Sequence, residues 1–162
     1  MKGNKPENPP EQEMPEYEMF PEGMWHMLGA VMLMVFSAGG IVILFSRIVA
    51  PLVEIETLAI LSFGGAVVMA LILSTPTFLL SRGWARCHTF LLWLNALYLF
   101  AFMVGVGFFF LQGKYGLVSI GLVGILFVGL ARYLYNSRSY RAGVEHYRLI
   151  WAHYRAGTNR KG

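Results

Sequence analysis

The sequence is poor in cysteine and in charged residues. Cys87 is its one cysteine among 162 residues, and charged residues make up 14% of the chain. One cysteine excludes an intramolecular disulfide, and it excludes a zinc or CxxC redox site built from thiols. Cysteine usage therefore gives no information on the compartment.

Charge is almost absent from four long apolar segments. None of them contains Asp, Glu or Lys, and the first Arg is Arg132, one helical turn from the end of the last segment. Each segment is close to the roughly 20 residues that a 30 Å hydrocarbon layer requires. Continuous apolar runs predict helices, because a lipid-exposed backbone must satisfy its hydrogen bonds within the segment. The sequence thus predicts an all-α integral membrane four-helix bundle over residues 24–135, with spans 24–46, 57–81, 88–111 and 115–135.

Residues for catalysis or metal binding are also lacking. The spans hold no carboxylate and no pair of thiols, so neither an enzyme site nor the buried ionisable group of a pump is expected. The four histidines form no HxxxH or HExxH pair. Clustered methionines from Met14 to Met34 resemble copper(I) ligands, but methionine is also a common filler of apolar helices. We expect a protein that is not an enzyme and has no cofactor or metal.

The first 23 residues contain five prolines and six glutamates. Such a composition cannot form a core and predicts a disordered acidic arm. The apolar run that follows starts near Met24 and is too long for a signal peptide, so we expect no cleavage.

Lysine and arginine are distributed unevenly around the spans. Eleven of them flank the side that carries both termini, whereas Arg47 and Lys114 alone flank the other side. By the positive-inside rule both termini are expected in the cytoplasm. The predicted localisation is a bacterial inner membrane, crossed several times.

The tail, residues 136–162, carries a seven-residue repeat. Tyrosine recurs at every seventh position from Tyr133, and arginine follows one place after the last three tyrosines. Seven residues are nearly two helical turns, so the tail is predicted to be a basic amphipathic helix with an aromatic face. This helix lies at the membrane interface on anionic headgroups, or it projects into the cytoplasm and offers the same face to a partner subunit. The residues expected to bind a partner or lipid are Arg138, Tyr140, Arg141, Tyr147, Arg148, Trp151, Tyr154 and Arg155. Nucleic acid is not an expected partner, because the basic residues are few and no nucleic-acid fold is recognisable.

A few polar residues lie in the cytoplasmic half of the predicted spans. Two interpretations are open: they compensate for the kink at Pro76 and form one interhelical hydrogen bond through Asn95, or they line a small polar cavity for a ligand or headgroup. The residues of this polar cluster are His26, Ser74, Thr75, Thr77, His88 and Asn95.

Small residues occur in every span and mark where helices approach closely. Because lipid is as apolar as leucine, such residues decide which helix faces touch. We expect them to pack inside the chain in preference to forming a dimer face. The candidates are Ala38, Gly39, Gly40, Gly64, Gly65, Ala66, Ala70, Ala101, Gly105, Gly121 and Gly124.

These features together favour a non-catalytic accessory, anchoring or assembly subunit of a larger membrane complex. Its partners would be other membrane subunits or further copies of itself, together with anionic lipid. The alternative is a self-assembling pore or small channel of the holin type.

Overall fold

The computed structural model describes residues 23–84 and 86–159. Residues 1–22 of the predicted acidic arm lie outside the described residues. Within the described part the chain forms five α-helices and no strand. They are α1 (Met24–Val49), α2 (Ile55–Ser81), α3 (Arg86–Leu111), α4 (Tyr115–Asn136) and α5 (Arg138–Asn159).

Helices α1 to α4 are each long and apolar enough to cross a membrane. They contain the four predicted spans and differ from them by a few residues at the ends. For example, α1 runs to Val49 where the sequence predicted residue 46, and α3 begins at Arg86 where it predicted residue 88. The architecture is therefore that of a multi-pass membrane protein, with α5 added after the last span.

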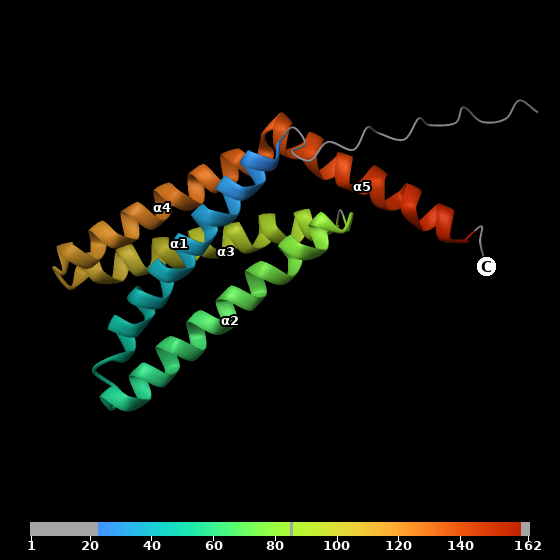
Figure 1. Cartoon of the computed structure of the whole chain (residues 1–162). Helices are drawn as coiled ribbons and strands as arrows, with labels where there is room; N and C mark the ends of the chain where they lie inside the picture. The colour runs from blue at the N-terminus through green and yellow to red at the C-terminus, as the bar shows by residue number, and fades with distance from the viewer. Residues whose placement is uncertain (1–22, 85, 160–162) are drawn as a thin grey trace, which may run out of the picture.

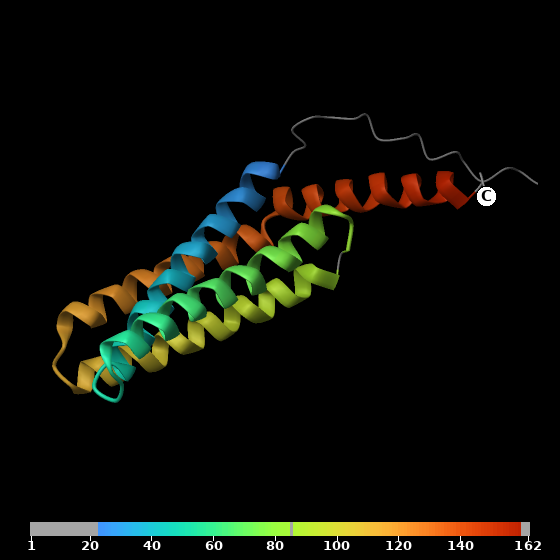
Figure 2. The same ribbon diagram turned by 60° about the horizontal axis from the view of Figure 1, so that its bottom comes forward.

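The four spans run up and down, so their connections gather at two ends (Figures 1 and 2). We call the end with Gly23, residues 81–84 and residues 136–138 the termini end. The opposite end, with residues 50–54 and 112–114, is the loop end. Toward the loop end the α1–α2 hairpin diverges from the α3–α4 hairpin, as Figure 1 shows. Helix α5 starts at the termini end and runs past it.

Helices α1, α3 and α4 form a tightly packed core. Phe102 of α3 is fully buried, and its ring lies against Gly40 of α1 and Gly124 of α4. Leu44 of α1 packs against Gly105 of α3 in the same way. Each large side chain thus fills the space that a glycine leaves open, which permits close backbone approach.

Helix α2 lies at the edge of this core. Added Cβ atoms at Gly64 and Gly65 would meet nothing within 4 Å. Near the loop end a hydrogen bond of 2.7 Å between the Ser46 and Ser62 hydroxyls links α2 to α1. The buried residues of α2 all lie in its last third: Leu73, Pro76 and Leu80. In the first two thirds of α2 no described side chain is fully buried, and Leu58, Ser62, Gly65 and Met69 are partly buried.

Candidate functional site

The candidate site is the termini end, where α5 meets the bundle. Helix α4 ends at Asn136, and Ser137 adopts an extended conformation, with φ −65° and ψ 150°. The Ser137 hydroxyl accepts a hydrogen bond of 3.1 Å from the Tyr140 backbone N–H. A serine at this position satisfies an otherwise free N–H of a helix start. The chain therefore turns at Ser137.

Tyr140 fixes the start of α5 on the bundle. Its side chain is 1% exposed, and its ring lies 5.2 Å from Tyr135 of α4 and 5.4 Å from His88 of α3, measured between centroids. Burial, and secondly the nearby Tyr135 phenol, raises the pKa of Tyr140 well above its usual range. Tyr140 is thus a neutral, buried aromatic side chain through which α5 contacts α3 and α4.

Two glycines allow α5 to lie close to the bundle. Gly23 and Gly83 both have positive φ, of 95° and 82°. A Cβ at Gly23 would overlap the carbonyl oxygen of Ser139, and a Cβ at Gly83 would lie 3.0 Å from the Cβ of Trp151. Since left-handed backbone and close approach both favour glycine, these two positions are specific contact points for α5.

Trp151 holds the middle of α5 against the α2–α3 connection. Its indole Nε1–H donates a hydrogen bond of 3.0 Å to the Ser81 carbonyl. The Arg82 guanidinium lies 5.8 Å from the Trp151 ring centroid, within cation–π range. Tyr147 is partly buried on the same side of α5, and its carbonyl oxygen would lie 3.3 Å from a Cβ at Gly83. Two of the aromatic side chains predicted to face lipid or a partner, those of Tyr140 and Trp151, therefore contact the chain's own bundle. Tyr147 approaches the bundle through its backbone carbonyl.

Three arginines of α5 are exposed to the surroundings of the molecule. Arg138, Arg141 and Arg148 are exposed, and Arg148 forms a salt bridge of 2.6 Å with Glu145. The predicted contact residues Tyr154 and Arg155 fall beyond the side chains that the structure describes. The exposed surface of this helix thus carries these three arginines and Glu145, while Tyr140 and Trp151 are turned toward the bundle.

The predicted polar cluster is distributed over separate places. Asn95 is 1% exposed, and its Nδ2 donates a hydrogen bond of 3.0 Å to the Val128 carbonyl of α4. It also lies 3.4 Å from the Met34 sulfur of α1. This is the interhelical hydrogen bond that the first interpretation of the cluster predicts.

The remaining members of the cluster do not converge on Asn95. Thr77 donates a hydrogen bond of 2.7 Å to the Leu73 carbonyl, four residues earlier in α2, and Ser74 makes a longer one of 3.4 Å to Leu71. Thr75 lines an apolar groove of about 510 Å³ between α2 and α3. His26 is partly buried near the start of α1, whereas His88 belongs to the contact with Tyr140.

Sequence reasoning missed the contact between His88, Tyr135 and Tyr140, and the roles of Gly23 and Gly83. A glycine directly before or after a span is a signal for such a contact, but glycine is also common in ordinary connections. Within the described residues no three His, Cys, Asp or Glu side chains gather as they would around a metal ion.

Comparison with known proteins gives no relative. No protein-family model, no curated protein and no solved structure matches the chain.

Proposed function

We propose that this protein is a non-catalytic accessory, anchoring or assembly subunit of a membrane complex, which binds another membrane protein through α2. The observation that carries the proposal is the packing of α2. Along 27 residues it buries only Leu73, Pro76 and Leu80. In a membrane, helices associate through faces of small residues. The glycines of the core are covered within the chain, while Gly64 and Gly65 are not.

The outward side of α5 supports a second contact with the same complex or with anionic headgroups. Arg138 and Arg141 are exposed, and neither is in a salt bridge with another described residue. Cations beside a membrane surface contribute about 1 kcal/mol each toward binding anionic lipid. We propose that the protein lies in a bacterial inner membrane with both termini on the cytoplasmic side, because lysine and arginine are concentrated at the termini end.

The test is site-specific photo-cross-linking in the native membrane. Ile60 of α2 is 72% exposed and Leu126 of α4 is 57% exposed, so a photoreactive residue at either position reaches its surroundings. A subunit of foreign sequence should be captured from position 60 and not from position 126. Gly64→Leu, on the same side of α2 as Ile60, should reduce this capture about tenfold.

Gly129→Leu is the matched control. Gly129 also faces open space, so this substitution adds the same side chain to a different helix and should leave capture unchanged. If position 60 captures only further copies of this chain, and reconstituted vesicles leak dye, the protein is a self-assembling pore.

A flotation assay tests the α5 contact separately. The assay measures binding of the tail peptide 136–159 to vesicles that contain phosphatidylglycerol. Replacing Arg138 and Arg141 with glutamate reverses the charge at these two positions and should abolish this binding. Unchanged binding of the variant peptide would remove lipid from the proposal.

A further inference from the structure

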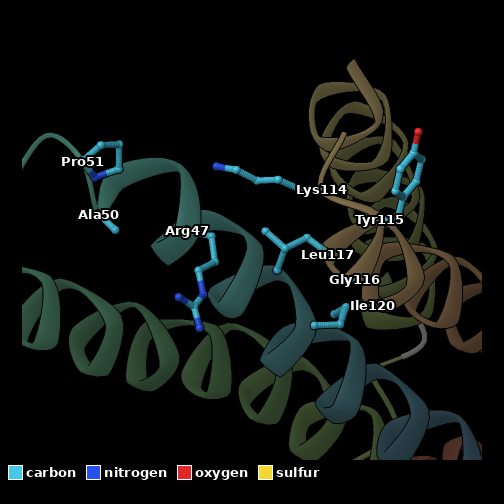
Figure 3. A pocket seen from close by; sticks show the side chains of 8 residues that line it. All are labelled: Arg47, Ala50, Pro51, Lys114, Tyr115, Gly116, Leu117 and Ile120. Atoms are coloured by element: carbon cyan, nitrogen blue, oxygen red, sulfur yellow. The ribbon is translucent and has the colours of Figure 1, made fainter. Parts of the chain in front are cut away.

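The loop end holds a groove between the two diverging hairpins. Its volume is about 620 Å³, and residues from the end of α1 and the start of α4 line it (Figure 3). Arg47 stands on the α1 side and Lys114 on the α4 side, with the Lys114 side chain extending across the groove. Tyr115 also lines the groove. Tyrosine, like tryptophan, is enriched at membrane interfaces.

Neither cation forms a salt bridge with another residue that the structure describes. Arg47 and Lys114 are exposed, and the salt bridge that occurs among the described residues joins Arg148 to Glu145 at the other end of the molecule. Lys114 directly precedes α4, whose first free N–H groups add partial positive charge at the same place. The groove is thus suited to an anion.

An apolar groove of about 510 Å³ continues from this place along α1 and α4. Ile120 lines both grooves. Gly39 leaves the apolar groove open, because a Cβ there would meet nothing within 4 Å. Phe36 and Phe127 lie at the far end of the groove with ring centroids 6.1 Å apart.

The two grooves together have the length of one membrane leaflet. Arg47 and Phe36 are eleven residues apart in α1, which corresponds to about 16 Å along a helix. This is about half of the roughly 30 Å hydrocarbon layer. A cationic site at the membrane surface is therefore continuous with an apolar channel that reaches the middle of the bilayer.

From this geometry we propose that the groove binds an anionic phospholipid. Arg47 and Lys114 hold the phosphate by charge-assisted hydrogen bonds, and one acyl chain lies along Ile120 to Phe36 and Phe127. A soluble phosphate compound would use the cationic part alone and would leave the apolar part empty. The site is at the opposite end from α5, so it is independent of the function proposed above.

The experiment uses purified full-length protein in detergent and a phosphatidylglycerol with a photoreactive acyl chain. Cross-linked peptides should map to α1 and α4 between residues 36 and 47 and between residues 116 and 127. Arg47→Gln and Lys114→Gln should each weaken this labelling about fivefold. Arg86→Gln, the same change at the exposed start of α3 at the termini end, should leave labelling of these peptides unaltered.

The apolar groove is tested with Gly39→Leu, whose side chain enters the groove without meeting the core, since a Cβ there has nothing within 4 Å. Labelling should fall at least tenfold, whereas Gly129→Leu should have no effect. Thermal unfolding of both variants identifies any loss that comes from misfolding.

Competition separates the possible sources of the phosphate. Millimolar glycerol phosphate should not displace the lipid, whereas unlabelled phosphatidylglycerol should, and phosphatidylcholine should compete more weakly. Full displacement by glycerol phosphate would show a site for soluble phosphates and overturn the proposal. Labelling that is as strong in Arg47→Gln and in Gly39→Leu as in the unaltered protein would also overturn the proposal.

Discussion

Phe102 shows how single residues determine the packing of this bundle. Its fully buried ring would overlap a Cβ at Gly124 and would lie 3.1 Å from a Cβ at Gly40. A backbone that approaches so closely has no space for even one added methyl group at Gly124, whereas Gly129, five residues later, faces outward with nothing within 4 Å.

Gly124→Ala should therefore destabilise the bundle by about 1–3 kcal/mol, the usual cost of overpacking a core. Gly129→Ala, the same change in the same helix, should alter stability by no more than about 0.5 kcal/mol. Unfolding in mixed detergent micelles measures both values. Equal stabilities of the two variants would contradict the packing of the Phe102 ring against Gly124.

At the scale of elements, the chain divides into three closely packed helices, an edge helix and a docked helix. Helices α1, α3 and α4 share the glycine contacts, α2 lies at their edge, and α5 attaches through Tyr140, Trp151 and two glycines. The attachment of α5 depends on backbone contact at Gly83, where Tyr147 and Trp151 approach within about 3 Å of an added Cβ.

Gly83→Ala should displace α5 from the bundle, because the new methyl group meets backbone as well as side-chain atoms. Gly113→Ala is a matched control: Gly113 also has a positive φ, of 69°, but nothing lies within 4 Å of an added Cβ. Both variants should lose about 1–2 kcal/mol through left-handed strain. Only Gly83→Ala should lengthen the distance between spin labels at Val68 and His153, measured in a Cys87→Ser background.

An unchanged distance in Gly83→Ala would mean that α5 does not rest on this connection. A change in both variants would mean that strain alone, and not contact with α5, moves the helix.

At the scale of the whole molecule, the two ends differ in charge. We expect the loop end, with Leu52 and Gln112, to face away from the cytoplasm. Single cysteines at these positions should react with a membrane-impermeant maleimide in intact cells, and cysteines at Arg138 and Ala142 should react only after lysis. All four positions are exposed, so burial does not confound the comparison. The reverse pattern would contradict the orientation proposed here.

The spans could be predicted from the sequence because crossing a bilayer requires a continuous apolar helix, and such a run is visible without knowledge of neighbours. Which face of each helix packs inward could not be predicted. Gly39 and Gly40 are adjacent in the sequence, yet Gly40 contacts Phe102 and Gly39 faces open space. Adjacent residues differ by about 100° around a helix, so the rotation of α1 decides the difference.

The site shows the same limit. The repeat in the tail indicated which residues share a face of α5, but it carries no information on what covers that face. Tyr140 and Trp151 contact the bundle because the bend at Ser137 directs α5 across its end, and that direction depends on contacts with α1, α2 and α3. The exposed arginines were predictable, since the cost of burying charge keeps them outside.

The contact between Gly23 and Ser139 has a consequence for biosynthesis. It joins the residue that precedes the first span to a helix that is translated after all four spans. During synthesis, the entry of α1 thus stays uncovered until the ribosome has passed α4. A chain truncated shortly after Tyr135 would contain all four spans, but the start of α1 would lack its contact with α5. This uncovered start of α1 would be accessible to the quality-control proteases of the membrane.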